Sequence, residues 1–291
     1  MQNVAKHLKF AVIIPAYNEE EHLSKCLKSL LNQTLKPHTI VVVDDSSTDN
    51  TGEIIKAFEN KNTIITSIYQ ASETKHLPGQ KVINAFKKGL NSLNLNDFDI
   101  ICKFDADLIF PSHYLEEINK AFVSDKKIGL CGGVCSVENS GRWQTEKLTN
   151  LDHIRGALKA YRVEAFKDIG GLPSQMGWDT ADEFKLRYKK WKINVLHNLP
   201  VKHLKPTATS YQDSYFKKQG QVFYALRYSF LLTLIASLKI AKQRNQLSKF
   251  KVVLNSYLKS KNKKLNFLLS REEGQYLRHY RWNQIWRKLR P

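Results

Sequence analysis

The 291-residue sequence lacks the marks of several large protein classes. Its four cysteines form no paired framework, which argues against a disulfide-stapled secreted domain and favours a reducing cytoplasm. Cys131 and Cys135 lack a second pair of ligands nearby in the sequence, so no zinc site is expected. The first nine residues are largely polar and the next apolar run has only five residues, so no signal peptide is expected. Internal repeats and low-complexity tracts are absent.

A long uncharged apolar run is also missing. The most apolar segment, residues 222–238, is split by Arg227 and ends before Lys239. Its uncharged part, residues 228–238, has eleven residues, whereas a membrane-spanning helix needs about 20. We therefore expect a helix that is buried against the rest of the chain or lies in a membrane interface.

Acidic residues are few, 27 against 46 Lys and Arg, and the net charge of +19 is uneven. Residues 239–291 contain fifteen Lys or Arg, two Glu and many interleaved aromatic residues. This pattern predicts peripheral contact of residues 222–291 with an anionic membrane. The alternatives are a solvated helical extension and nucleic-acid binding. Nucleic acid is disfavoured as a partner because the rest of the chain is nearly balanced in charge and no nucleic-acid-recognition motif is present.

Buried, β-branched runs alternate with segments of helical periodicity. The expected strands are 10–14, 40–43, 63–69 and 98–101, and the expected helices are 23–31, 54–58 and 81–93. Pro15 is expected to end the first strand. The order predicts an α/β fold in which a mostly parallel sheet has helices on both faces.

Polar motifs follow three of these strands. They are Pro15-Ala16-Tyr17, Asp44-Asp45 and Asp105-Ala106-Asp107. Ligands of parallel sheets bind beyond the carboxyl ends of the strands, so the three motifs are expected at one edge. Asp105 and Asp107 are two residues apart and can point to one place, which suits Mg2+ or Mn2+ with a diphosphate as co-ligand. A glycine-rich phosphate loop is absent at Pro15, which disfavours a nucleotidyltransferase.

These motifs, together with Pro78-Gly79-Gln80-Lys81 and residues 177–183, resemble the family 2 inverting glycosyltransferases with the GT-A fold. The resemblance covers about residues 8–210 and implies a Rossmann-like α/β/α sandwich. The implied domains are a GT-A domain at 1–215, with a nucleotide-sugar half at about 8–110 and an acceptor half at about 111–215, and a basic, aromatic-rich helical extension at 216–291.

The resemblance also implies roles for single residues. Those implied to bind the nucleotide-sugar are Pro15, Ala16, Tyr17, Glu19, Asp45, Lys81, Asp105 and Ala106. Tyr17 would lie against the base, Asp45 would accept the base N3–H, and Glu19 would reach the ribose. Asp107 and His203 would hold Mn2+ or Mg2+, and an imidazole ligand suits Mn2+ better. Without the resemblance, His203 reads as a surface or packing residue. Ser46 stands where the family usually has glycine.

A catalytic base is needed to take the proton of the acceptor hydroxyl. The resemblance places it among Asp182, Asp179 and Glu183, in that order of preference, with Trp178 against the acceptor. We expect Asp182 and Glu183 to open a helix. The alternative is structural: Thr180 and Glu183 have the spacing of a capping box, and Trp178 is then a core residue.

The resemblance therefore implies a metal-dependent inverting enzyme that moves one sugar from a nucleotide-sugar to a hydroxyl of a glycan or lipid-linked acceptor. A UDP-sugar is favoured, and GDP- and dTDP-sugars remain open. The implied setting is polysaccharide or glycolipid assembly at the inner face of a bacterial cell membrane. The alternative is a catalytically degenerate protein on the same fold that binds nucleotide, membrane or nucleic acid.

Overall fold

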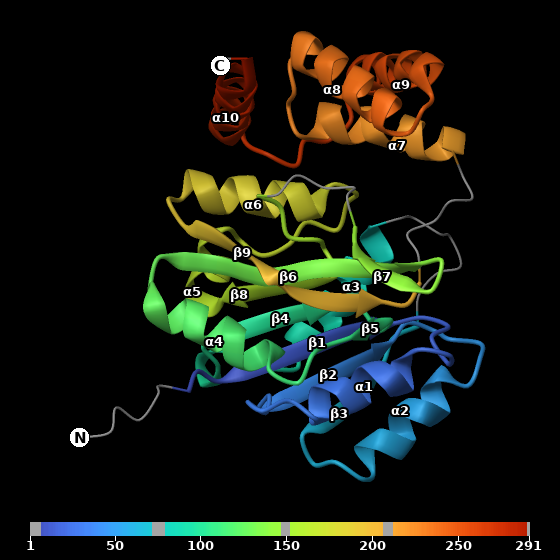
Figure 1. Ribbon diagram of the computed structural model, residues 1–291, viewed down its shortest axis with the longest axis vertical. Coiled ribbons are helices and arrows are strands. Elements are labelled where there is room, and N and C mark those ends of the chain that lie inside the picture. Colours follow the sequence, from blue (N-terminus) through green and yellow to red (C-terminus); the bar gives the residue numbers. More distant parts are fainter. Residues whose placement is uncertain (1–6, 72–78, 147–151, 206–211, 290–291) are drawn as a thin grey trace. The chain divides into compact units, whose positions relative to one another are not determined.

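The computed structural model describes residues 7–71, 79–146, 152–205 and 212–289 (Figure 1). The chain forms two compact units. The first comprises residues 1–174 and 189–206, and the second comprises residues 175–188 and 207–291.

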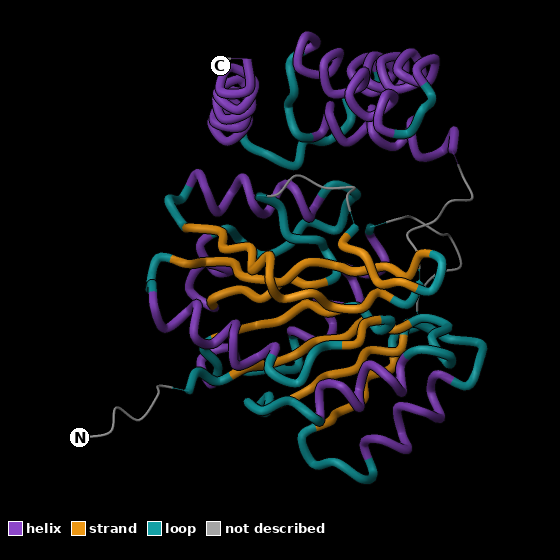
Figure 2. Tube along the Cα trace, viewed as in Figure 1, coloured by secondary structure: helices purple, strands orange, loops and turns teal. Residues whose placement is uncertain are grey.

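The first unit is built on a mixed sheet (Figure 2). Within the described residues the strand order is β3-β2-β1-β4-β8-β6-β9-β5, with β7 paired to β6. The strands are β1 (Phe10–Ala16), β2 (Thr39–Asp44), β3 (Ile65–Tyr69), β4 (Ile100–Phe104), β5 (Leu108–Ile109), β6 (Ile128–Asn139), β7 (Arg142–Thr145), β8 (Leu158–Arg162) and β9 (Lys192–His203). Strands β3, β2, β1 and β4 are parallel, as expected, and β8 runs antiparallel to β4. The predicted α/β fold, with parallel strands β3, β2, β1 and β4, is confirmed.

Helices pack against this sheet. They are α1 (Leu23–Leu31), α2 (Thr51–Glu59), α3 (Gln80–Leu90), α4 (Tyr114–Ser124) and α5 (Val163–Asp168), with a short 3-10 turn η1 (Leu95–Asp97). Helix α3 approaches β1 and β2 so closely that a Cβ at Gly89 would lie 2.7 Å from Ile13 Cγ2 and 2.9 Å from Val43 Cγ2.

Strand β1 extends beyond its expected end. It continues through Pro15 to Ala16, and every residue in it is buried. The ladder between β1 and β4 reaches only Ile13, so Pro15 removes no hydrogen bond from it. On the other side, Asp45 N–H donates to Ala16 O at 2.9 Å. The expectation that Pro15 ends the strand was therefore wrong by two residues.

The second unit is helical. It contains α6 (Trp178–Tyr188), α7 (Gln212–Ala225), α8 (Phe230–Gln243), the 3-10 turn η2 (Leu247–Lys249), α9 (Phe250–Asn262) and α10 (Arg271–Leu289). Its core joins Ala181 and Phe184 of α6 to side chains of the C-terminal helices, and the rings of Phe184 and Tyr280 meet edge to face at 5.5 Å. The division therefore differs from the expected boundary at residue 215, because the apolar face of α6 packs against α10.

The apolar segment 222–238 is two helices rather than one. The chain breaks between α7 and α8, where Arg227 has a φ of 58° and Ser229 Oγ accepts the N–H of Leu232 at 3.3 Å. The Arg227 guanidinium lies 3.6 Å from the ring centre of Phe267, and its Nε donates to Leu269 O at 2.7 Å. In the part of the chain that the structure describes, no helix combines the length and apolar character needed to cross a membrane.

Candidate functional site

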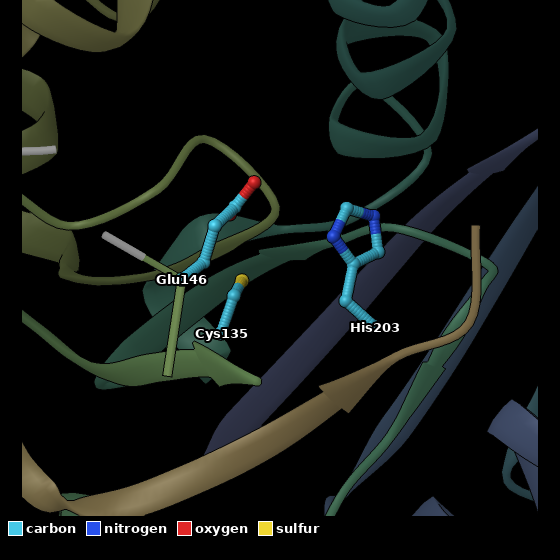
Figure 3. Close-up of side chains that lie close together, drawn as sticks. All are labelled: Cys135, Glu146 and His203. Carbon is cyan, nitrogen blue, oxygen red and sulfur yellow. The ribbon is translucent and has the colours of Figure 1, made fainter. Parts of the chain in front are cut away.

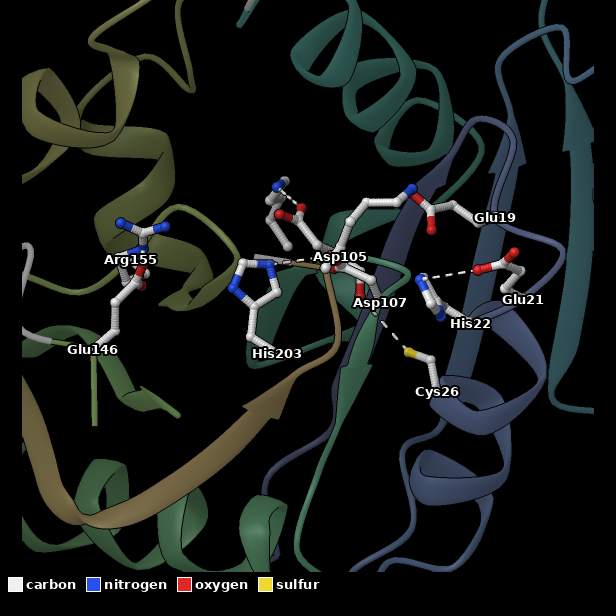
Figure 4. Close-up of polar contacts among 11 residues, drawn as sticks. Glu19, Glu21, His22, Cys26, Asp105, Asp107, Glu146, Arg155 and His203 are labelled. Atoms are coloured by element: carbon white, nitrogen blue, oxygen red, sulfur yellow. Dashed lines mark hydrogen bonds and ion pairs between the residues drawn. The ribbon is translucent and has the colours of Figure 1, made fainter. Parts of the chain in front are cut away.

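Asp107 and His203 form the centre of the candidate site in the first unit (Figure 4). Leu108 of β5 is in register with His203 of β9, and Leu204 N–H donates to Asp107 O at 2.9 Å. This pairing brings His203 Nε2 to 3.1 Å from Asp107 Oδ2, with both side chains 9% exposed. The aspartate and the histidine, 96 positions apart in the numbering, thus lie side by side.

The pairing of Asp107 with His203 shifts the pKa of both side chains. Burial by itself would raise the pKa of Asp107, but the hydrogen bond and charge of His203 outweigh burial and lower it. Burial would likewise lower the pKa of His203, but the hydrogen bond that its Nε2–H donates to Asp107 and the negative charge of Asp107 outweigh burial, so this pKa is raised. The pair therefore favours a charged carboxylate beside a protonated imidazole in the metal-free protein.

These shifts predict how the stability of the metal-free protein depends on pH. Asp107, whose folded pKa is lowered, contributes stability above its ordinary value of 3.8 and loses it as the pH falls through the folded value. His203, whose folded pKa is raised, contributes stability below 6.5 and loses it as the pH rises through the folded value. We expect the unfolding temperature in chelator to fall as the pH rises above about 6.5.

The His203→Gln variant should lose this alkaline decline, whereas His113→Gln, which removes an exposed imidazole at the N-terminal end of α4, should keep it. Thermal unfolding across the pH range distinguishes the two variants. An equal alkaline decline in His203→Gln and the native protein would contradict the assignment.

Asp105 faces a different partner. Lys103 Nζ forms an ion pair with Asp105 Oδ1. Lys103 of β4 lies directly opposite Lys159 of β8, and the two lysines are only 1% and 0% exposed. Lys103 therefore places positive charge beside Asp105. Neither lysine was predicted to have a role, although a lysine inside an otherwise apolar strand was a visible signal.

Tyr17, Asp45 and Lys81 lie near the carboxyl ends of β1 and β2 in the same unit. Tyr17 is 48% exposed, and Lys81 Nζ is 5.7 Å from the centre of its ring. Asp45 is 3% exposed and accepts a hydrogen bond from Gln70 Nε2 at 3.0 Å. Gln70 was not predicted and orients the carboxylate. Pro15 and Ala16 are the buried end of β1; Pro78 lies outside the described residues.

Ser46 has a backbone conformation that is unusual for serine. Ser46 has a φ of 64°, in the left-handed region that favours glycine. Its Oγ donates to Gln70 O at 2.9 Å. The neighbouring loop is fixed by Asn18, whose N–H donates to Ser47 Oγ at 3.0 Å and whose Oδ1 accepts the N–H of Thr48 at 2.8 Å. The loops after β1 and β2 are therefore joined.

Glu19 lies close to Asp105 and Asp107 (Figure 4). Burial raises its pKa, although the ion pair with Lys205, at 2.8 Å from Oε1, opposes the rise. Its Oε2 is buried and has no hydrogen-bond partner among the described residues. Carboxylate oxygens with an imidazole nitrogen are donors that suit Mn2+. The residues present thus fit a divalent cation, with Asp107 and His203 as the paired donors.

The predicted acceptor segment lies in the second unit, on α6. The helix begins at Trp178 and ends at Tyr188, so Thr180 lies inside it and the capping-box interpretation is wrong. Trp178, Asp182 and Glu183 are buried, and Asp182 Oδ1 accepts the N–H of Glu183 at 2.7 Å. Asp179 lies in the first turn of the helix. The roles of Asp179, Asp182, Glu183 and Trp178 remain predictions.

Comparison with known proteins agrees with the family resemblance seen in the sequence. The model of a family described as glycosyl transferase family 2 matches residues 11–177, more than half of the chain. The glycosyltransferase GlyA of Streptococcus pneumoniae serotype 4 is 36% identical over 115 residues, which are 40% of this chain and 15% of GlyA. The chain spans about a third or less of the length of the first curated relatives that it matches.

Solved structures share the fold. S. aureus TarS 1–349 in complex with UDP-GlcNAc has a TM-score of 0.56 at 18% identity, and the match covers 84% of this chain and 71% of TarS 1–349. The mannosyltransferase PcManGT of Pyrobaculum calidifontis, in complex with GDP-Man and Mn2+, has a TM-score of 0.58 at 14% identity. That match covers 96% of this chain and 81% of PcManGT.

Proposed function

Because the chain belongs to glycosyl transferase family 2, we propose that it moves a single sugar, with inversion, from a nucleotide-sugar to a hydroxyl of a glycan or lipid-linked acceptor. The observation that carries the proposal is the Asp107–His203 pair, held at 3.1 Å in the same unit as the buried Asp45 carboxylate and its partner Gln70. Asp107 and His203 suit a cation that is bound to a diphosphate, and the carboxylate of Asp45 suits an N–H group of a nucleobase.

A UDP-sugar is the favoured donor. Asp45 presents a buried carboxylate, held by Gln70, that suits the N3–H of a uracil. The TarS complex contains UDP-GlcNAc, which agrees with this choice, whereas the PcManGT complex contains GDP-Man and keeps a guanine donor open. The Mn2+ in PcManGT supports Mn2+ over Mg2+, in line with an imidazole donor.

In the proposed sugar transfer, these residues have separate roles. The acceptor oxygen bonds to the anomeric carbon as the bond from that carbon to the diphosphate oxygen breaks. A bound divalent cation supplies Lewis-acid stabilisation of the departing diphosphate. Asp107 and His203 would hold that cation, and Asp182 would accept the proton of the acceptor hydroxyl. Tyr17 and Asp45 would orient the nucleobase of the donor.

The proposed contact between Asp45 and the nucleobase gives a direct prediction. Asp45→Ala should raise the Kd for UDP by about tenfold to a hundredfold, because a hydrogen bond to a charged group is worth about 1.5–3 kcal/mol. Asp97→Ala, which removes an exposed carboxylate in η1, should leave the Kd unchanged. Calorimetric titration measures both constants, and thermal unfolding without ligand checks that each variant is folded. An unchanged UDP affinity in a folded Asp45→Ala protein would remove Asp45 from the base site.

We place the enzyme at the inner face of the cell membrane, in polysaccharide or glycolipid assembly, with residues 222–291 as the contact. The second unit supplies exposed apolar side chains on α8, namely Phe230 and Leu231, which are 50% and 52% exposed. Basic side chains are numerous in the helices that follow. This combination suits an anionic surface.

The membrane proposal predicts that Phe230→Ser/Leu231→Ser lowers the affinity for vesicles of anionic phospholipid by about tenfold to a hundredfold, because both side chains lose apolar area to bury. Val123→Ser, which removes an exposed apolar side chain of α4, should leave the affinity unchanged. Vesicle sedimentation measures the bound fraction. Equal binding by the double variant and the native protein would contradict the proposal.

The proposed function itself is tested by the release of nucleoside diphosphate from UDP-GlcNAc and GDP-Man, with and without Mn2+. We expect release from the preferred donor to require Mn2+ and to fall in Asp107→Asn. If neither donor is bound or cleaved in the presence of Mn2+, the proposed transfer from a UDP- or GDP-sugar is contradicted.

A further inference from the structure

A cysteine, a glutamate and a histidine meet in the first unit (Figure 3). They are Cys135 of β6, Glu146 immediately after β7, and His203 at the end of β9. One ligand atom of each residue lies within 4.8 Å of the ligand atoms of the other two. Two strands and the residue that follows a third strand thus bring together three metal-binding atoms of different chemistry.

Strand register explains why they meet. Ser136 of β6 is paired with Thr145 of β7, and Glu146 N–H donates to Cys135 O at 2.9 Å, which places Glu146 opposite Cys135. On the other side, Cys135 is in register with Val201, two residues before His203. Paired residues, and residues two apart on one strand, share a face of the sheet. The three side chains therefore project from the same face.

The cluster is buried and contains an unpartnered nitrogen. Cys135 is 2% exposed, and the Glu146 and His203 side chains are 7% and 9% exposed. His203 Nδ1 is buried and has no hydrogen-bond partner among the described residues. One ring nitrogen of His203 faces Cys135 and Glu146 (Figure 3), and the opposite one faces Asp107 (Figure 4). Since Nε2 pairs with Asp107, Nδ1 is the nitrogen aimed into the cluster.

We propose that Cys135 Sγ, a Glu146 carboxylate oxygen and His203 Nδ1 form a site for a thiophilic divalent cation of the Zn2+ class, distinct from the site at Asp107. Sulfur, imidazole and carboxylate are the donors that Zn2+ takes, and a thiolate disfavours Mg2+ and Mn2+. Tetrahedral Zn2+ with bonds of about 2.0–2.3 Å needs ligand atoms roughly 3.3–3.8 Å apart. Because 4.8 Å is the upper limit here, small side-chain rotations suffice.

Neighbouring residues support this donor set. Arg155 Nε lies 3.3 Å from Glu146 Oε2 and holds the carboxylate beside Cys135. It also offsets the negative charge that a thiolate and a carboxylate bring into a buried place. Three protein ligands leave a fourth position for water or another small ligand, as in catalytic zinc sites.

His203 links the new site to Asp107. With a cation on Nδ1, the Nε2–H donates to Asp107 Oδ2, the arrangement of carboxylate–histidine–metal triads. The protonated Nε2 then offers no lone pair to a cation on the donor side. A Zn2+-class ion at this cluster should therefore oppose Mn2+-dependent binding of nucleotide.

Cobalt(II) titration of the full chain tests the site without an activity measurement. We expect one equivalent of Co2+ to produce a thiolate-to-cobalt charge-transfer band in the near ultraviolet, and one equivalent of Zn2+ to abolish it. Cys135→Ala should lack the band, and Cys131→Ala, which removes another buried thiol of β6, should keep it. Asp107→Asn should also keep it, so this test does not depend on the donor site.

Two results would overturn the proposal: no band in the native protein, or a band that survives in Cys135→Ala. Circular dichroism of the metal-free variants establishes that each is folded. If Cys135→Ala does not fold, His203→Gln replaces it, and a band with the native intensity and wavelength in that variant would equally exclude the site.

Discussion

Asp107→Asn is expected to slow sugar transfer by roughly a hundredfold to a thousandfold, because an amide holds a diphosphate-bound cation far more weakly than a carboxylate. Asp107 is buried beside His203, so the substitution removes one of the two paired donors while the β5–β9 pairing stays in place. The measurement is the turnover number as a function of Mn2+ concentration, with UDP-GlcNAc as donor.

Asp97→Asn is the matched control, since it removes one exposed carboxylate charge in η1 and should leave turnover unchanged. Native turnover in Asp107→Asn at every Mn2+ concentration would exclude Asp107 as the residue that holds the cation.

Asp182→Asn is expected to lower turnover by about a hundredfold to ten-thousandfold while the affinity for the donor stays near the native value. The reason is that a general base acts in the transition state and contributes nothing to the binding of the nucleotide. Asp182 is completely buried on α6, where its Oδ1 already accepts the N–H of Glu183. Steady-state kinetics and a separate binding titration measure the two quantities.

Asp179→Asn and Glu183→Gln are the controls for this prediction, because both residues lie on the same helix. A loss confined to Asp182→Asn supports its assignment. If the loss appears in Asp179→Asn instead, the role of base moves to Asp179.

Much of the first unit could be predicted because its strands are strongly patterned. The runs at Phe10–Ile14 and Ile40–Val43 are apolar and β-branched, and both became buried parallel strands. The neighbourhood of Asp107 and His203 also followed from motifs, since the family resemblance assigned both residues to one cation and the structure places them 3.1 Å apart. Local sequence was sufficient where one short segment carries the pattern.

What could not be predicted depends on register between distant strands. Nothing in the sequence near Cys135 indicates that Glu146 and His203 lie beside it, and the pairing of β6 with β7 and β9 alone brings them together. Gln70 was missed for the same reason, because it follows β3 and reaches Asp45 through the β2–β3 pairing. Residues 175–188 were assigned to the first domain, since their apolar face gave no sign that its partner is the distant helix α10.

The proposed function depends on the binding of a nucleoside diphosphate to the first unit through a divalent cation held by Asp107. Its most direct test is thermal unfolding with UDP, GDP, dTDP or CMP, each with and without Mn2+, for the native protein and Asp107→Asn. A ligand that binds the native state raises the unfolding temperature by mass action. We predict a shift with UDP that requires both Mn2+ and Asp107. A shift that is equal without Mn2+ or in Asp107→Asn, or no shift with any nucleotide, would contradict this mode of binding.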